Sequence, residues 1–256
     1  MEVNGAPILG WLIPIGFILA FLLILRYLTR HREPLRRKPS FEGIEPPGLV
    51  RAYDFISRTP QFTLLRVLVV LQLKRHRPSG RFVDVGCGPG YLLGVVGRRF
   101  RRLQLMGIDI SQTMIDAARR SLAHKGLGDR VAFRQGDIGR LPLHDNSVDF
   151  VVSTFSLHHW GNPLEALREV HRVLKPKGQF LLFDLRRDAR SLVYWFLRFA
   201  TTFVVPQPLR QVKEPLGSLL ASYTAREMQT CLAKVAFRKT STTSGLIWLF
   251  VWGQKG

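Results

Sequence analysis

The chain of 256 residues is 46% hydrophobic and 22% charged, which allows one sizeable globular domain with an appendage and excludes two large domains. A formal net charge of +20 favours anionic partners, whether lipid headgroups, nucleic acid or an acidic substrate, without choosing among them. The two cysteines, Cys87 and Cys231, are far apart and match no zinc-binding spacing. Neither a disulfide framework nor a structural metal is therefore predicted.

The first element in chain order is predicted to be a membrane anchor within residues 1–30. No charged residue occurs from Val3 to Leu25, and residues 8–25 are almost wholly apolar, near the roughly 20 residues of a bilayer span. A cleaved signal peptide would carry basic residues before the apolar run, whereas here they follow it. A buried core helix is disfavoured because the run is apolar on all sides.

A basic cluster, opposed by Glu33 alone, follows this apolar run. It predicts a single-pass protein whose remaining chain lies on the cytoplasmic side of the membrane. The cluster suits contact with anionic lipid and is equally the ordinary flank of a stop-transfer segment, so both interpretations stay open. Its members are Arg26, Arg30, His31, Arg32, Arg36, Arg37 and Lys38.

Residues 31–50 are predicted to be a linker, because positions 34–48 hold four prolines and two glycines. The globular domain is predicted over residues 51–256 and opens with a helical region at 51–77. Beyond it, short apolar runs alternate with amphipathic stretches, which predicts an α/β fold with a mostly parallel seven-stranded sheet and helices on both faces. The predicted strands are 81–85, 103–109, 130–134, 147–153, 179–184, 237–243 and 246–252. The predicted helices are 91–100, 111–124, 162–174 and 224–234.

A glycine-rich loop joins the first strand to the next helix, and residues 83–91 read VDVGCGPGY. Spaced glycines let a backbone turn tightly and approach a ligand closely, which indicates a nucleotide-like cofactor. A dinucleotide-binding motif would need a further glycine where Tyr91 or Leu93 stands, so that interpretation fails. The chain also lacks a Gly-Lys-Ser/Thr phosphate loop, so nothing supports ATP or GTP hydrolysis.

Two acids follow at the ends of the next two predicted strands. Asp109 lies about 20 residues beyond the loop, the spacing at which an acid meets ribose hydroxyls. It is alternatively an acid at a helix N-terminus, beside the cap residue Ser111. Asp137 lies where open sheets bind ligands and can accept an adenine amino group, although turn chemistry is the other interpretation.

These motifs resemble the class I methyltransferases that depend on S-adenosylmethionine (SAM), specifically the type 11 subfamily that contains the ubiquinone and menaquinone C-methyltransferases. The resemblance runs from about residue 53 to residue 252 and implies the Rossmann-like class I methyltransferase fold. Its strongest segments are residues 83–90, 107–109, 136–137, 141–142, 147–151 and 172–178. SAM carries a sulfonium and an ammonium but no phosphate, so acids rather than lysines are expected around it.

The resemblance also implies which residues bind SAM. For the methionine and ribose portion it implies Asp84, Ser153 and the loop residues Gly86, Cys87, Gly88 and Gly90. For the adenosine portion it implies Asp109 on the ribose, Ile110 on the adenine face, and Asp137 with Ile138 at the adenine edge. Tyr53 is similar to the aromatic residue of a lid helix over the cofactor.

The candidate general base lies in residues 153–160, which read STFSLHHW after the fourth predicted strand. Histidine has a pKa near neutrality, so His158 or His159 is the catalytic candidate if the acceptor must lose a proton. A structural or pocket-lining role for the pair is the alternative. The remaining histidines show no metal-ligand spacing, so no metal is predicted.

Residues 184–223 resemble the substrate-covering cap of the subfamily. Between residues 192 and 205 only Arg198 is charged, while Trp195, Phe196 and Phe199 are aromatic. This stretch is expected to line an apolar pocket or enter the bilayer interface, or to pack on the sheet as an ordinary amphipathic helix. With the anchor it predicts a hydrophobic or lipid acceptor and makes nucleic acid a weaker expectation. RNA or protein methylation through residues 98–102 and 186–187, or a non-catalytic membrane adaptor, are the alternatives.

Overall fold

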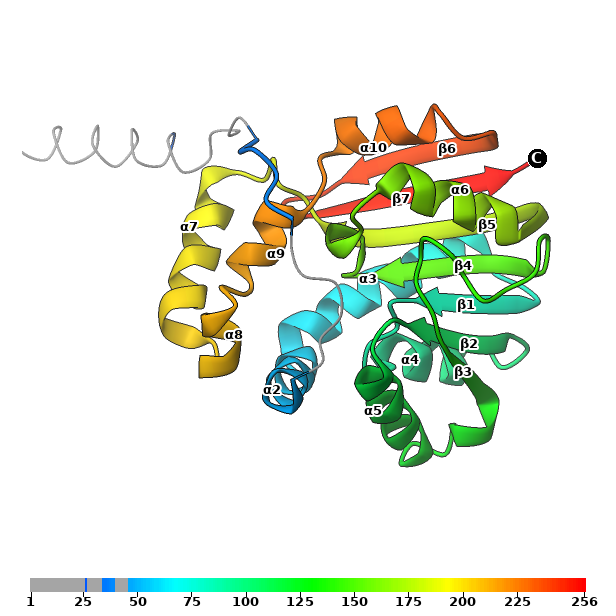
Figure 1. The fold of residues 1–256 in the computed structure, drawn as a ribbon, viewed down its shortest axis with the longest axis horizontal. Coiled ribbons are helices and arrows are strands. Elements are labelled where there is room, and N and C mark those ends of the chain that lie inside the picture. The colour runs from blue at the N-terminus through cyan, green and yellow to red at the C-terminus, as the bar shows by residue number, and fades with distance from the viewer. Residues whose placement is uncertain (1–25, 27–33, 40–45) are drawn as a thin grey trace, which may run out of the picture.

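The computed structural model describes residues 26, 34–39 and 46–256. The predicted membrane span at residues 8–25 lies outside these residues and stays a prediction. Among the described residues, no helix combines the length and the hydropathy that crossing a bilayer requires. Figure 1 shows one α/β unit in which the helices surround a central sheet.

The predicted seven-stranded, mostly parallel sheet is confirmed, with the strand order β3-β2-β1-β4-β5-β7-β6. Strand β7 pairs antiparallel with both of its neighbours, and the other pairings are parallel. The strands are β1 (Arg81–Val85), β2 (Gln104–Asp109), β3 (Val131–Gln135), β4 (Val148–Thr154), β5 (Leu174–Leu185), β6 (Phe237–Ser244) and β7 (Trp248–Lys255). The chain reverses its strand order after β3, which places a ligand-binding crevice at the carboxyl ends of β1 and β4.

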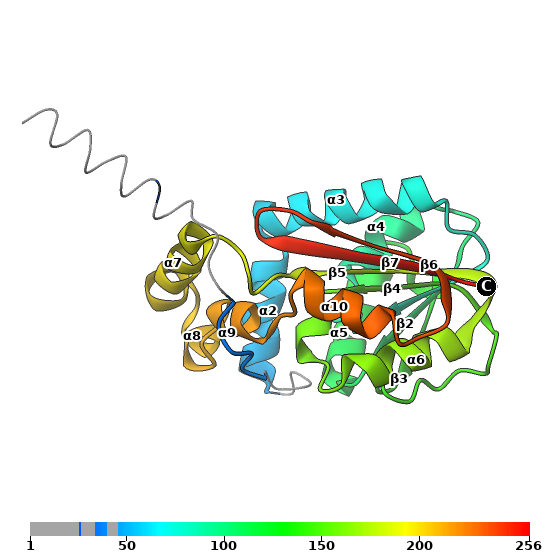
Figure 2. The ribbon, with the colours of Figure 1, turned by 90° about the horizontal axis from the view of Figure 1, so that it is seen from above.

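Helices cover both faces of the sheet (Figure 2). On one face, Phe82 and Phe150 pack with residues of α3 (Pro60–His76) and α4 (Tyr91–Arg99). On the other, Val83 and Val151 pack with α6 (Pro163–Val173) and α10 (Ala225–Leu232). Helix α5 (Gln112–Ala123) lies against β2 and β3. Neighbouring strand residues point to opposite faces, so the central strands β1 and β4, which are covered on both faces, are mostly buried and apolar.

The predicted helix at 51–77 is two helices. Helix α2 (Pro47–Ser57) ends before α3 begins at Pro60. A proline cannot donate the helical hydrogen bond and drives the preceding residue to extended backbone, which is the conformation of Thr59. Helix α2 also begins inside the predicted linker, at Pro47 rather than after residue 50.

The end of α6 and the start of β5 differ from the prediction as well. The helix ends at Val173, and β5 begins at Leu174 rather than at residue 179. Leu174 pairs with Val148, and the register then shifts before Gln179 pairs with Phe150. Strand pairing with β4 therefore overrides the proline and glycine that follow the helix in the sequence.

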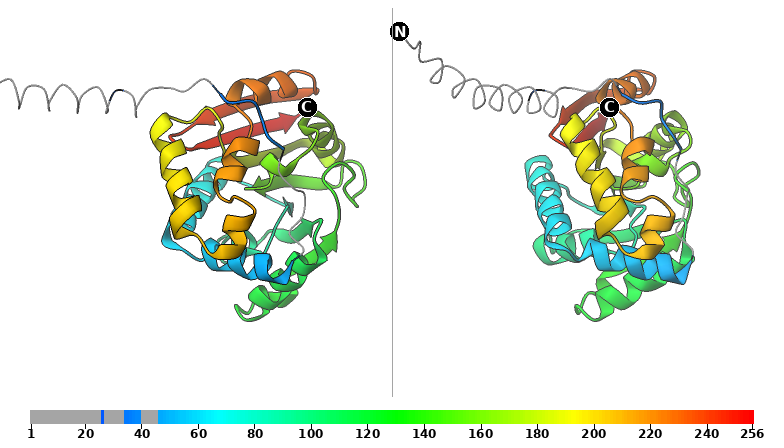
Figure 3. Two further views of the ribbon diagram at one scale, coloured as in Figure 1. Left: turned by 60° about the vertical axis from the view of Figure 1, so that its left-hand side comes forward. Right: turned by 90° about the vertical axis from the view of Figure 1, so that its left-hand side faces the viewer.

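The segment between β5 and β6 builds a small layer at the carboxyl ends of the parallel strands. It contains α7 (Ser191–Phe199), a π-helical turn (Ala200–Val204), α8 (Gln207–Gln211) and α9 (Leu216–Ala221). Ala52 of α2 packs against Val205 and Leu209 of this segment. Figures 1 and 3 show α2, α7, α8 and α9 together beyond the carboxyl ends of the parallel strands.

Candidate active site

The glycine loop is held to the neighbouring strand by its own backbone. The amides of Gly86 and Cys87 donate to the carbonyl of Ile108, at 2.8 and 3.1 Å. The amide of Gly88 donates to Oδ2 of Asp109 at 2.8 Å. The loop therefore takes its shape from the end of β2, and Gly86 and Gly88 line a cavity.

Two of these glycines differ in what surrounds them. Both have positive φ, +69° at Gly86 and +48° at Gly88. A Cβ on Gly86 would lie 2.3 Å from Oγ of Ser156, whereas a Cβ on Gly88 would meet nothing within 4 Å. The close approach at Gly86 brings the loop against the segment after β4, so this position requires glycine for two reasons.

Replacing each glycine with alanine should separate the effect of the left-handed backbone from the effect of the close contact with Ser156. We expect Gly88→Ala to lower the free energy of unfolding by about 1–2 kcal/mol through its left-handed backbone. Gly86→Ala should cost about 1–3 kcal/mol more because its Cβ overlaps Ser156. Chemical denaturation of the SAM-free protein measures both values. Equal losses in the two variants would contradict the packing argument.

Asp109 lies at the cavity and beside the start of α5, so its position is compatible with both interpretations of the sequence. Its side chain lines the cavity. Its carboxylate also accepts from the backbone, Oδ2 from Gly88 and Oδ1 from the amide of Ser111 at 3.0 Å. Ser111 in turn caps α5 by accepting from the amide of Met114. A carboxylate has about four acceptor positions, so it can accept from more than one donor at once.

Asp137 likewise combines both interpretations, since it lines the cavity while its Oδ1 accepts from the amide of Gly139 at 2.7 Å. The structure brings together at one cavity eight of the residues that were predicted to form the site. These are Tyr53, Gly86, Gly88, Asp109, Ile110, Asp137, Ile138 and His159.

Further lining residues were not predicted: Val85, Met114, Gly136, Phe155, Ser156 and Trp160. Phe155, Ser156 and Trp160 lie in the same run as the two histidines. The position of that run after the fourth strand was the sequence feature that could have indicated them as lining residues. Met114 carries no such signal, because an apolar residue in the first turn of an amphipathic helix is ordinarily core.

Five predicted residues are not among those that line the cavity: Asp84, Cys87, Gly90, Ser153 and His158. Gly90 precedes α4 and faces Ala118 of α5, where a Cβ would lie 3.1 Å away, so its role here is helix packing. Burial raises the pKa of the Cys87 thiol well above its usual value, which keeps the thiol protonated and unsuited to nucleophilic attack.

Asp84 on β1 and Ser153 on β4 are buried polar residues of two neighbouring strands. Each is 1% exposed. Among the described residues, neither Oδ1 of Asp84 nor Oγ of Ser153 has a hydrogen-bond partner. Burial, followed by the nearby charge of Asp109, raises the pKa of Asp84 well above its usual value. A buried acceptor of this kind is costly unless a donor or a cation meets it.

These features fit SAM. The acids and the unpartnered acceptors match a ligand that carries an ammonium and a sulfonium but no phosphate. The glycine loop leaves room for close backbone contact, and Ile110 and Ile138 offer apolar surfaces to a base. Tyr53 of α2 closes the cavity from the other side, and burial raises the pKa of its phenol.

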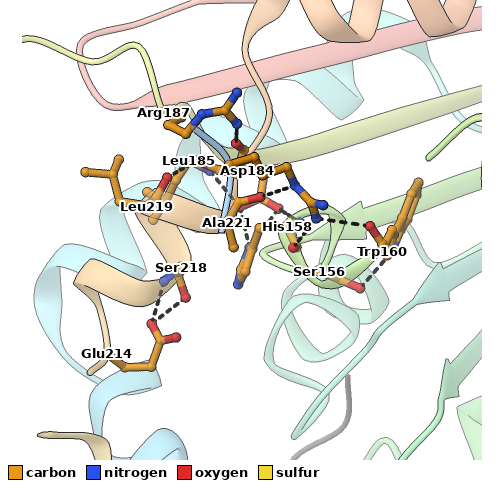
Figure 4. A network of polar contacts seen from close by, with 12 residues as sticks. Ser156, His158, Trp160, Asp184, Leu185, Arg187, Glu214, Ser218, Leu219 and Ala221 are labelled. Atoms are coloured by element: carbon orange, nitrogen blue, oxygen red, sulfur yellow. Dashed lines mark hydrogen bonds and ion pairs between the residues drawn. The ribbon is translucent and has the colours of Figure 1, made fainter. Parts of the chain in front are cut away.

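A histidine–aspartate pair lies beside the cavity (Figure 4). Nδ1 of His158 is 2.8 and 2.9 Å from the two oxygens of Asp184, a residue near the end of β5. The amide of His158 also donates to Oδ2 of Asp184 at 2.8 Å. The ring of His159, which lines the cavity, lies with its centroid 4.0 Å from that of His158.

The carboxylate of Asp184 determines the protonation behaviour of His158. Burial alone lowers the pKa of the imidazole, but the charge and hydrogen bond of Asp184 outweigh it, and the net pKa is raised. Nδ1–H donates to Asp184, which leaves Nε2 as the proton acceptor in the neutral ring. Nε2 is buried and has no hydrogen-bond partner among the described residues. This arrangement orients an imidazole as a general base.

Arg37, near the N-terminus, contacts the segment that contains the two histidines. The guanidinium of Arg37 donates to the carbonyls of Ala221, His158 and Trp160, at 2.7, 3.0 and 3.2 Å. It also lies 4.1 Å from the ring centroid of Tyr223. Arg37 was predicted to belong to the membrane-flanking basic cluster. In the structure, Arg37 instead contacts the segment that contains the two histidines.

No group of three or more histidine, cysteine, aspartate or glutamate side chains suited to a metal ion occurs within residues 34–39 and 46–256.

The part of the chain that forms much of this cavity is similar to known methyltransferases. Residues 83–182 match the type 11 methyltransferase family model, described as "Methyltransferase domain". The chain is 29% identical over 171 residues to the ubiquinone/menaquinone biosynthesis C-methyltransferase of Desulfotalea psychrophila, over 62% of this chain and 67% of that one. It spans only 32% to 48% of the length of the next curated relatives.

Solved structures share the fold. A putative SAM-dependent methyltransferase of Methanococcus maripaludis superposes with a TM-score of 0.62 at 20% identity, over 80% of this chain and 91% of that one. The geranyl diphosphate C-methyltransferase of Streptomyces coelicolor superposes with a TM-score of 0.50 at 14% identity, over 70% of each chain.

Proposed function

We propose that the chain is an S-adenosylmethionine-dependent methyltransferase that works at a membrane and methylates a hydrophobic small molecule such as a quinone, an isoprenoid or another lipid. The proposal includes a single N-terminal span with the catalytic domain on the cytoplasmic side. The names of two similar proteins fit it, since one acts in ubiquinone and menaquinone biosynthesis and the other on geranyl diphosphate.

The observation that carries the proposal is the apolar surface of the segment that covers the strand ends. On α7 and the turn after it, Trp195, Phe196, Phe199 and Phe203 are 42%, 64%, 57% and 69% exposed. Contiguous apolar surface of this kind marks a membrane or partner contact in a water-soluble domain. The inner side of the same helix packs through Val193 and Leu197.

The chain's own residues can then be assigned to the steps of methyl transfer. When bound, SAM supplies an electrophilic methyl group on its sulfonium. Asp84 is proposed to accept from the ammonium of the methionine moiety, and Asp109 from the ribose hydroxyls. Tyr53, Phe155 and Trp160 exclude water from the cavity, where in-line transfer depends mainly on positioning.

The His158–Asp184 pair is proposed to take a proton from the acceptor. His158 lies behind His159, so the proton reaches Nε2 either directly after a small ring movement or through one water. The carboxyl group of Asp184, which is hydrogen-bonded to Nδ1 of His158, stabilises the imidazolium that results. A base in this position suits an acceptor hydroxyl, or a ring carbon that must lose its proton after methylation.

Incubation with labelled SAM tests this function. We expect the full-length protein, mixed with a membrane lipid extract, to place the label in the organic-soluble fraction. Asp84→Asn serves as the control for background transfer. Label that appears in RNA or protein, with none in lipid, would replace the proposal with a macromolecular substrate. Failure to bind SAM in calorimetry would instead indicate a non-catalytic adaptor.

A further inference from the structure

A second cavity lies on the other side of the helix that follows the glycine loop. It is open, has a volume of about 570 Å³, and is formed by α3, α4 and the residues after α5. Its lining contains Thr63, Tyr91 and four basic side chains, Arg66, Arg98, Arg99 and Lys125. No carboxylate belongs to the lining.

The ring of Tyr91 is the centre of this basic cluster. Nζ of Lys125 lies 4.6 Å from its centroid, and the guanidinium carbons of Arg66 and Arg58 lie at 5.3 and 6.0 Å. The nearest acid, Asp54, accepts from the Tyr91 hydroxyl at 2.5 Å and forms an ion pair with Arg58 at 2.7 Å. Asp54 is therefore paired with Arg58, which does not line the cavity.

The four lining cations form no ion pair with any acid in the part of the chain that the structure describes. Neutral groups orient two of them. Arg66 donates to the carbonyl of Ser57 at 2.7 Å and to Oγ1 of Thr63 at 3.0 Å. Lys125 donates to Oγ of Ser121 at 3.1 Å. Arg66 and Lys125 are therefore positioned without an acidic partner, while Arg98 and Arg99 are exposed at the cavity wall.

This arrangement is unfavourable in the absence of a ligand. Burial lowers the pKa of Arg66, and burial together with the charges of Arg98, Arg58 and Arg66 lowers the pKa of Lys125. Arg98 and Arg99 suit the C-terminal turn of α4, because cations interact favourably with that end of a helix. That preference does not explain why cations from three separate segments converge on one cavity.

We propose that this cavity binds a phosphate-bearing ligand, held by Arg66, Arg98, Arg99 and Lys125. Guanidinium groups match phosphate oxygens in paired hydrogen bonds, and a lysine adds a point charge. The ligand is a phosphate monoester or diphosphate that is either free in solution or the headgroup of an anionic lipid.

The surroundings of the cavity show how a lipid headgroup would fit. On α3, Leu64, Val67 and Leu71 are 63%, 47% and 53% exposed and recur at helical spacing. Val95, which is 40% exposed, lies on the cavity wall itself. Apolar side chains therefore border the basic cavity, as a headgroup site at a bilayer surface requires.

Inorganic pyrophosphate tests the site in calorimetry at fixed ionic strength, with the full-length protein in neutral detergent. We expect the variant R98Q/R99Q to weaken pyrophosphate binding by about tenfold or more, since it removes two charge-assisted contacts. The matched control is R101Q/R102Q, which removes the same charge from neighbouring exposed residues outside the cavity. This control should change the affinity by less than about twofold.

Sedimentation with vesicles then identifies the source of the phosphate. Vesicles that contain phosphatidic acid are compared with vesicles of phosphatidylcholine alone. A loss of binding to the acidic vesicles in R98Q/R99Q, but not in R101Q/R102Q, assigns the site to a headgroup. Pyrophosphate binding without such a loss assigns it to a soluble phosphate compound.

Two results would overturn the site. Equal weakening in both double variants would mean general attraction to a basic surface, and no pyrophosphate binding by the unaltered protein would remove the proposal. SAM binding and thermal unfolding establish that each variant is folded. If R98Q/R99Q does not fold, Lys125→Gln takes its place, with an expected loss of several-fold.

Discussion

Asp84→Asn is expected to weaken SAM binding by about 10- to 100-fold while making the SAM-free protein more stable at neutral pH. The loss of affinity follows from removing a charged acceptor for the SAM ammonium, an interaction of about 1.5–3 kcal/mol. The gain in stability follows from burial, because the carboxylate is 1% exposed and its Oδ1 has no hydrogen-bond partner among the described residues. Calorimetry and chemical denaturation measure the two effects separately.

The sign of the stability effect depends on pH. The pKa of Asp84 in the fold is raised above that of an unfolded chain, so the folded state holds its proton more tightly. This group therefore favours folding at low pH and loses that contribution as the pH rises from the unfolded towards the folded pKa. Asparagine removes this pH dependence. Asp129→Asn, at an exposed residue, is the control and should change neither property.

A variant Asp84→Asn that binds SAM as well as the unaltered protein would show that the carboxylate does not meet the ammonium. A variant that is less stable than the unaltered protein at neutral pH would show that the ionised carboxylate has a partner in the fold.

His158→Gln is expected to lower the methyl-transfer rate by about 10²- to 10⁴-fold, with SAM affinity nearly unchanged. The unaltered enzyme should gain rate as the pH rises through the pKa of His158, because only the neutral imidazole accepts a proton. Asp184 raises that pKa above the usual 6.5, so the midpoint of the profile should lie above 6.5. Rate measurements across pH, with the acceptor found in the lipid extract, supply the profile.

Asp184→Asn distinguishes chemistry from structural support. It should move the midpoint of the profile to lower pH, since the charge that raises the pKa of His158 is gone. A purely structural role for Asp184 would lower the rate without moving the midpoint. His144→Gln, at an exposed residue, is the control. A flat profile in the unaltered enzyme would mean that methyl transfer needs no base.

The cofactor site was largely predictable from local sequence, because its chemistry is tied to positions at strand ends. The spaced glycines and Asp109 each follow a strand, and parallel strands that share an edge bring their carboxyl ends together. Asp137 reaches the same cavity for the same reason. What could not be predicted is which loop residues line the cavity and which lie behind it, as Gly88 and Gly90 show. That distinction depends on contacts with α5, far along the chain.

The sequence indicated only one member of the histidine–aspartate pair. The sequence indicates His158 and His159 as candidates, and nothing in it singles out Asp184 as a partner. Asp184 lies 26 residues from His158 and reaches it because β5 pairs in register beside β4. In the sequence, the basic run at residues 98–102 was considered as a contact for RNA or an acidic protein. Only the packing of α3 beside α4 places Arg66 and Arg98 around one cavity.

The amino-acid sequence by itself determined the class of fold, the glycine loop and the acids that suit a sulfonium cofactor, since these depend on local pattern and on the order of strands. The tertiary structure decided the partner of His158, the contacts of Arg37 and the second cavity. Each of these depends on side chains that are distant in sequence and meet only when helices and strands pack together.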